Sequence, residues 1–174
     1  AAVDKIKEMF VPEKKIIEEI EGTKEENNAV LQEGSVGYVI YFDQERYKMD
    51  KNQEWDRILP KVDMGDLPEV YMEIRQIKGK TPDQLQGELE QQLNKEYSDV
   101  KNYGQVQNPI KGIAIRALDG KQWNSTLVKY YLVDDTQGGS FVIKQKFFLE
   151  AEEGHGARFD NMLEEFRIIA LQGE

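Results

Sequence analysis

The sequence predicts an α+β domain in which helices cover an antiparallel sheet, and the last third of the chain gives the clearest evidence. In residues 141–149 the odd positions are apolar apart from Gln145, which is typical of a strand with one buried face. Apolar residues then recur at the i, i+3, i+4 and i+7 spacing of an amphipathic helix: Phe159, Met162, Leu163 and Phe166. A period of two that changes to 3.6 indicates a strand followed by a helix that covers the sheet.

Two turns predict that the strands before this helix are sequential and antiparallel. Asp119-Gly120 is a strong signal for a tight hairpin turn between strands at 110–118 and 123–133. A second turn, at 134–139, returns the chain into the strand at 141–149. The sequence therefore predicts a three-stranded meander.

The middle of the chain predicts one helix and further strands. Thr81 suits the N-cap and Pro82 the first helical position, and three leucines follow at a spacing of four: Leu85, Leu89 and Leu93. Buried or half-buried strands are expected at 36–42, 47–49 and 70–75, with a long loop at 50–66.

Residues 1–34 predict a helical N-terminal arm ahead of a single domain at 35–174. Val3, Ile6 and Phe10 mark one helical stripe. Pro12 begins a second short helix, whose apolar positions are Ile16, Ile17 and Ile20. The arm is expected to pack on its own domain, with packing on a partner as the alternative.

Composition excludes several classes of function. The chain has 23 basic and 33 acidic residues and a net charge of −10, which argues against sequence-independent nucleic-acid binding and against docking on anionic membranes. The absence of cysteine excludes disulfides, thiolate metal sites and cysteine nucleophiles. The longest apolar run, Val36 to Phe42, is far shorter than the roughly 18 residues of a membrane span. A start on Ala1-Ala2 without methionine is typical of a mature, exported form, although a trimmed domain would look the same.

The order of the predicted elements resembles the PsbP-like fold over residues 36–170. The order is strand, long loop, strand, helix, three-stranded meander and closing helix, with the Thr81-Pro82 helix start and the apolar spacing of 159–166. The resemblance implies an α/β/α sandwich, an antiparallel sheet with helices on both faces. Named members are an extrinsic subunit of the oxygen-evolving photosystem and a nuclear-transport factor that binds a small GTPase. Bacterial members, many exported or lipid-anchored, imply an extracytoplasmic location at the cell envelope, with a lipid anchor on the precursor as one form. Because the members share no single function, fold alone predicts no mechanism.

The single histidine, His155, is the most distinctive candidate site. It lies between two glycines and follows Glu150, Glu152 and Glu153, which together suggest a carboxylate-plus-histidine cation site. One histidine is weak support for zinc, whose sites usually use several histidines or cysteines. The favoured interpretation is structural, with His155 capping the last helix or packing against the sheet edge.

Other motifs indicate structure more than chemistry. Asp134 and Asp135 are weaker candidates for calcium because they lack spaced ligands, and turn chemistry accounts for them. Gly79-Lys80-Thr81 lacks the earlier glycine of a phosphate-binding loop. Five strand aromatics are candidates either for a ligand or peptide groove or for ordinary packing: Tyr38, Tyr41, Trp123, Tyr130 and Tyr131.

We therefore expect a soluble, acidic, non-catalytic binding or scaffold domain of an exported bacterial protein that acts through protein contacts. No cofactor is expected apart from a divalent cation at the weak candidate site. A cytosolic adaptor that binds a regulatory protein is the first alternative, and the resemblance to the transport factor implies it. A metal-dependent enzyme or sensor centred on His155 is the second.

Overall fold

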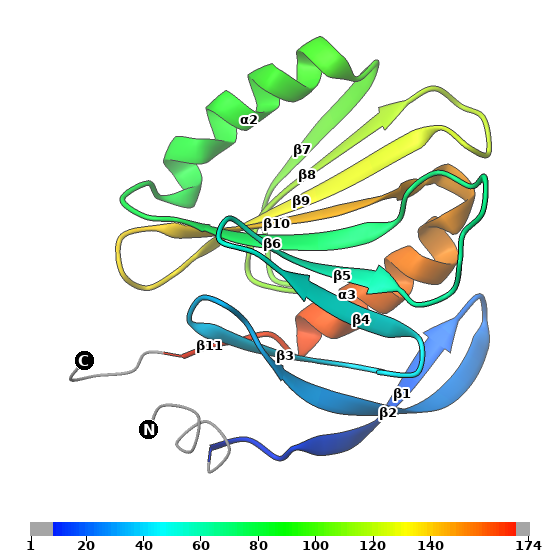
Figure 1. Ribbon diagram of the computed structural model, residues 1–174. Coiled ribbons are helices and arrows are strands. Elements are labelled where there is room, and N and C mark those ends of the chain that lie inside the picture. The colour runs from blue at the N-terminus through cyan, green and yellow to red at the C-terminus, as the bar shows by residue number, and fades with distance from the viewer. Residues whose placement is uncertain (1–8, 170–174) are drawn as a thin grey trace.

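The computed structural model describes residues 9–169, and in this range eleven strands form two antiparallel sheets (Figure 1). The seven-stranded sheet has the order β4-β5-β6-β10-β9-β8-β7, and the four-stranded sheet has the order β1-β2-β3-β11. The strands of the larger sheet are β4 (Tyr47–Lys51), β5 (Asp56–Pro60), β6 (Tyr71–Ile77), β7 (Asp99–Val106), β8 (Gly112–Asp119), β9 (Thr126–Asp134) and β10 (Ser140–Phe148). Those of the smaller sheet are β1 (Glu13–Ile20), β2 (Thr23–Glu33), β3 (Tyr38–Phe42) and β11 (Arg167–Ile168).

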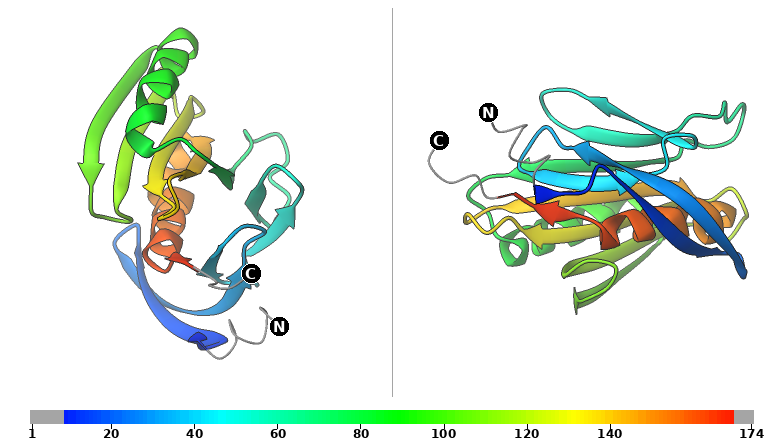
Figure 2. Two further views of the ribbon diagram at one scale, coloured as in Figure 1. Left: turned by 90° about the vertical axis from the view of Figure 1, so that its left-hand side faces the viewer. Right: turned by 90° about the horizontal axis from the view of Figure 1, so that it is seen from below.

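Two α-helices accompany the sheets in the described range. Helix α2 (Pro82–Glu96) packs on β7, β8 and β9. Helix α3 (Ala157–Glu164) follows the 3-10 turn η1 (Leu149–Ala151) and the π-turn η2 (Glu152–Gly156), and contacts β1 and β3. Figure 2 shows α3 between the larger sheet and the β1–β2 hairpin. Neither helix is long and apolar enough to cross a membrane, and this holds for every helix of the described residues.

The predicted α/β/α sandwich is wrong, because the protein is a β-sandwich. Strands account for 48% of the chain and helices for 20%, and the second layer is a sheet where the prediction had helices. The error arose because β1, β2, β5 and β7 were not recognised as strands. The prediction therefore lacked most of the smaller sheet and one edge of the larger sheet.

The predicted second helix of the N-terminal arm is also wrong, because its residues form a strand. Val3 and Ile6 of its first stripe lie outside the described residues, and the predicted second helix is strand β1. Strand β1 pairs with β2 over its whole length, and β2 pairs with β3, so the hairpin belongs to the smaller sheet. Its two-residue turn, Glu21-Gly22, has positive φ at both positions (51° and 80°), as a type I′ hairpin turn requires. The three isoleucines fit a helical spacing, but pairing within the sheet overrides that preference.

One further strand replaces a predicted loop, another lies where no element was predicted, and one predicted turn is longer than expected. Strand β5 lies within the predicted loop at 50–66, where the buried Asp56 interrupts the apolar pattern. Strand β7 is an edge strand with polar residues and an irregular register between Asn102 and Gly104. The chain between β8 and β9 needs six residues after Asp119, so the tight Asp119-Gly120 hairpin is not formed.

The other predicted elements are confirmed. The three strands expected at 36–42, 47–49 and 70–75 correspond to β3, β4 and β6, and the meander corresponds to β8, β9 and β10. Helix α2 starts at Pro82, with a reciprocal capping box between Thr81 and Gln84. The predicted covering helix is α3, which buries Phe159, Met162 and Leu163.

Two apolar clusters stabilise this arrangement. The larger lies between the sheets and includes all four predicted apolar residues of the closing helix. The smaller lies beneath α2 and is centred on Leu93, Ile113, Ile115 and Val128. The buried Asp56 of β5 connects the sheets, because its carboxylate accepts hydrogen bonds from the Ser35 amide (2.8 Å) and the Tyr38 hydroxyl (2.6 Å).

Candidate protein-interaction surface

His155 lies in the π-turn η2 and faces strand β4. Its Nδ1 is 2.7 Å from the hydroxyl of Tyr47, and its ring also contacts Phe159. Burial lowers the pKa of His155, and the nearby cations Arg158 and Arg46 lower it further. Burial raises the pKa of Tyr47, so the phenol keeps its proton, and the tautomer of His155 decides which of the two groups donates in this hydrogen bond. Because its pKa is lowered, the imidazole is neutral near pH 7.

The three glutamates before His155 do not join it. Glu152 points to the other side of the turn and pairs with Arg116 of β8 at 3.1 Å, while Glu150 and Glu153 are exposed. Over residues 9–169, no three or more histidine, aspartate or glutamate side chains gather in a way that could hold a metal ion. The arrangement at His155 thus favours the structural interpretation, in which the histidine packs the entrance of α3 against β4.

Asp134 and Asp135 organise the turn between β9 and β10. Asp135 is buried and accepts hydrogen bonds from the amides of Gln137 and Gly139 (2.8 Å each) and from Gln76 (2.9 Å). Burial acts to raise the pKa of Asp135, but these three hydrogen bonds outweigh it and hold the pKa below its usual range. The carboxylate is thus occupied by its own turn, which is the turn chemistry expected for this sequence.

The five strand aromatics do not form one groove. Tyr38 and Tyr41 lie on β3, where their hydroxyls bond Asp56 and the Val11 carbonyl. Tyr130 and Tyr131 are neighbours on β9 and therefore point to opposite faces of the sheet. Trp123 is exposed in the loop before β9.

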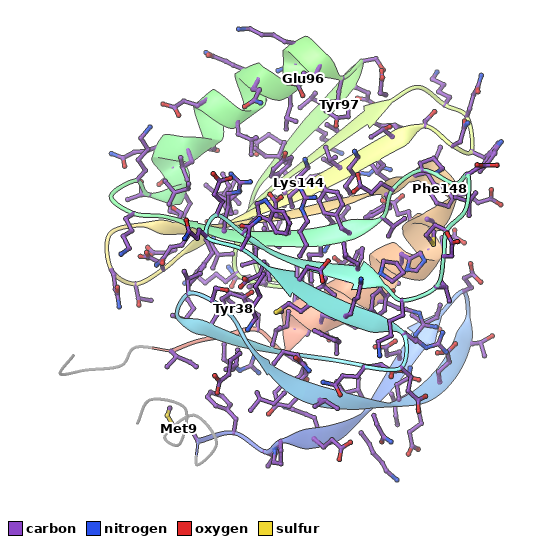
Figure 3. All side chains as sticks on the ribbon, viewed as in Figure 1. Met9, Tyr38, Glu96, Tyr97, Lys144 and Phe148 are labelled. Atoms are coloured by element: carbon purple, nitrogen blue, oxygen red, sulfur yellow. The ribbon has the colours of Figure 1, made fainter. Side chains whose placement is uncertain are left out.

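A different set of side chains gathers on the larger sheet, on the same face as α2 but beside it. We call this set the cationic–aromatic face, and it consists of Trp55, Arg57, Tyr71, Glu73, Arg75, Tyr130, Lys144 and Lys146. Helix α2 covers β7 to β9, whereas these residues lie mainly on β5, β6 and β10. Figure 3 labels one of these residues, Lys144, below Glu96 and Tyr97 at the end of α2.

Strand register places the central residues in one row. Tyr130 of β9 is opposite Lys144 of β10, Lys144 is opposite Glu73 of β6, and Glu73 is opposite Arg57 of β5. Because residues directly opposite each other in adjacent strands project from the same face, their side chains are in reach of one another.

Ion pairs and aromatic rings hold the two arginines of the cationic–aromatic face in place. The guanidinium of Arg57 lies between the rings of Trp55 and Tyr71, at 4.1 and 4.2 Å from their centroids, and is 3.0 Å from the Glu73 carboxylate. Arg75 binds the other oxygen of Glu73 at 3.2 Å. One buried carboxylate therefore faces two arginines, and the excess of positive charge stays on the surface.

The two lysines add to this charge. Lys144 lies 5.7 Å from the ring of Tyr71 and 6.0 Å from that of Tyr130, and Lys146 lies 5.9 Å from Tyr71. Lys146 has one exposed partner, Glu69, at 3.7 Å.

Strand β4 adds Lys48 and Asp50 to this face, and Asp50 is the register partner of Arg57. Five cations thus stand against three carboxylates, Glu73, Glu69 and Asp50, on one face of a chain whose net charge is −10. This local excess of positive charge is a surface feature that core packing does not require.

Sequence analysis missed this face because it assigned β5 to a loop. The signal was nonetheless present as alternation, with lysine at 144 and 146 and with Tyr71, Glu73 and Arg75 on alternate positions of β6. Only the pairing of β5 with β6 brings Arg57 and Trp55 to the same place.

A family model described as a domain of unknown function (DUF8580) matches residues 11–165. The chain belongs to the DUF8580 family. No curated protein matches it. In this DUF8580 chain the matched residues include the whole cationic–aromatic face as well as His155.

Proposed function

We propose that the chain is a non-catalytic binding domain whose cationic–aromatic face engages an acidic segment of a protein partner. The observation that supports this most is the excess of positive charge on an uncovered half of the larger sheet in an acidic chain. A metal-dependent function at His155 has no comparable support, because the glutamates before it point elsewhere.

Preorganisation favours binding at this face. Arg57 is fixed between two rings and by Glu73, so it loses little side-chain freedom when a partner binds. Arginine and aromatic residues are also enriched at the centres of protein interfaces. The cations can therefore donate to carboxylates while the half-buried rings of Trp55 and Tyr130 provide contact area.

The net negative charge of the chain limits the parts of its surface on which an acidic partner can dock. Most of the surface repels such a partner, while the local excess of positive charge attracts it at short range. Screening at physiological salt limits the long-range repulsion, because charges interact over a Debye length of about 8 Å.

Nuclear magnetic resonance of the ¹⁵N-labelled protein tests the proposal, with octaglutamate as the probe and octalysine as the control of opposite charge. Octaglutamate should shift amide signals of β5, β6 and β10 in a saturable way, and the shifts should weaken as salt increases. Octalysine should leave these signals unchanged. Shifts that fall on other strands, or equal shifts with both peptides, would overturn the proposal.

A further inference from the structure

A cleft of about 280 Å³ lies over β7, β8 and β9 on the face of the larger sheet opposite to α2. The residues that line it are Tyr103, Val106, Asn108, Ala114, Ile115, Arg116, Lys129, Tyr130, Tyr131 and Glu152, of which Ile115 and Tyr130 turn their side chains to the face of α2. Its volume is near the lower end of the about 300–1,000 Å³ of small-molecule sites, so it suits a small ligand.

The two cations that line the cleft are each paired with a carboxylate, and a third, Lys101, lies beside them as the register partner of Arg116, with its ammonium 4.6 Å from the Tyr103 ring. Arg116 and Lys129 are register partners on β8 and β9, so two cations stand side by side on one face. Glu152 of η2 neutralises Arg116, accepting from its Nε at 3.2 Å and from one terminal nitrogen at 3.1 Å. Asp160 of α3 neutralises Lys129 at 3.2 Å.

Hydrogen bonds extend this polar wall into the core. The Oδ1 atom of Asp160 accepts from the Tyr131 hydroxyl (3.4 Å) and from the amide of Gln145 (2.9 Å). Gln145 is fully buried, and its Oε1 has no hydrogen-bond partner among the described residues. Buried polar atoms are nearly always partnered, so this oxygen is an unsatisfied acceptor that lies behind the polar wall of the cleft.

We infer that this cleft binds a neutral, polyhydroxylated ligand of about the size of one sugar ring. A charged ligand would have to separate an existing ion pair. The hydroxyl groups of a neutral ligand can instead bond to the N–H donors and carboxylate lone pairs that the ion pairs leave unused. Arg116 has five N–H donors, of which two go to Glu152, and the Glu152 carboxylate has further lone pairs. Asn108 adds a donor and an acceptor.

Tyr103 adds an apolar platform to this polar lining. Its side chain is exposed, at 49% of its full surface, although it is aromatic and lines the cleft. An aromatic ring at the rim can pack against the C–H face of a sugar ring while the polar wall binds the hydroxyls. This inference does not depend on the proposed protein contact, which uses the opposite face of the sheet.

Titration of the ¹⁵N-labelled protein with D-glucose, D-galactose and N-acetylglucosamine tests the inference. Glycine and citrate serve as the zwitterionic and anionic comparisons, and each compound is raised to roughly 10 mM because a dissociation constant of 1 mM is weak specific binding. At least one sugar should shift the amide signals of β7 to β9 and of 152–160 in a saturable way. Glycine and citrate should leave those signals unchanged.

Two exposed aromatic residues provide a matched pair of variants. Tyr103→Ala should weaken the binding of that sugar at least about fivefold, whereas Trp123→Ala, which removes a ring of similar exposure outside the cleft, should leave it unchanged. The inference is overturned if no sugar shifts these signals, if only glycine or citrate does, or if both variants bind sugar equally well.

Discussion

The two halves of one face of the seven-stranded sheet are covered in different ways. Over β7 to β9, helix α2 buries an aliphatic surface around Leu93, Ile115 and Val128. Over β5, β6 and the part of β10 beyond Val142, the described sheet is covered mainly by its own arginine, lysine and aromatic side chains.

The difference shows how a sheet can leave part of a face open without exposing apolar area. Tyr71 is only 3% exposed although no helix lies over it, because Arg57 and the two lysines lie across its ring. Long cationic side chains can bury their stems and keep their charges in water. One half therefore contributes mainly to stability, and the other carries exposed charge, which we propose binds a partner.

The largest effect on stability is expected in the half covered by α2. Leu93 is the one fully buried side chain of that helix, and Leu93→Ala should lower the free energy of unfolding by about 3 kcal/mol through lost burial and the cavity left behind. Denaturant unfolding measures this. Gln92→Ala, at an exposed position of the same helix, should change it by less than about 0.5 kcal/mol. Equal losses for the two variants would show that α2 does not stabilise the sheet.

A smaller loss is expected at the buried carboxylate of the open half. Glu73→Gln leaves Arg57 and Arg75 facing each other without a counter-charge and should cost about 1–2 kcal/mol of unfolding free energy. The cost stays below that of a fully buried pair because the two arginine side chains are 26% and 37% exposed. Thermal or denaturant unfolding measures it, with Glu88→Gln at an exposed ion pair as the control. If the two variants lost the same stability, Glu73 would not organise the face.

The pH dependence of stability is expected to come from the other face of the larger sheet. There the hydrogen bond between His155 and Tyr47 holds the start of α3 against β4. The pKa of His155 is lowered in the folded protein, so the unfolded chain takes up the proton first as the pH falls through the ordinary value of 6.5. The stability that His155 contributes should therefore be full well above this value and decline as the pH falls through and below it. His155 is the single histidine, so His155→Phe should remove most of this decline. A decline of the same size in the variant would contradict this role.

The smallest effect on stability is expected for the lysines of the open half. Lys144→Gln removes a charge near two rings but leaves Tyr71 covered by Arg57, so the free energy of unfolding should change by less than about 1 kcal/mol. Denaturant unfolding at low and high salt measures this. A loss as large as that of Leu93→Ala would mean that the face is a packing element and not a free surface.

The sequence predicted the half covered by α2 much better than the open half. Thr81, Pro82 and the leucines of α2 act through local capping and a period that one segment displays by itself. The open face depends on the pairing of β5 with β6, and β5 carries the buried charge of Asp56 where the pattern needs an apolar residue. Its partner Tyr38 is remote in sequence, so no local pattern reveals why that charge is tolerated.

The same reason explains what local patterns could not show elsewhere. His155 was predicted as the most distinctive residue from its two glycines, but its partner Tyr47 lies 108 residues away, and only the fold brings them together. Residues 16–20 display a helical spacing that the long-range pairing of β2 with β3 overrides.

Calorimetric titration of octaglutamate into two double variants tests the central claim most directly. Both Lys144→Gln/Lys146→Gln and Lys111→Gln/Lys121→Gln remove two positive charges, but only the first pair lies on the cationic–aromatic face. The account predicts that the first variant binds at least about tenfold more weakly than the unmodified protein, and that the second stays within about twofold. Equal weakening in the two variants, or no binding by the unmodified protein, would contradict it.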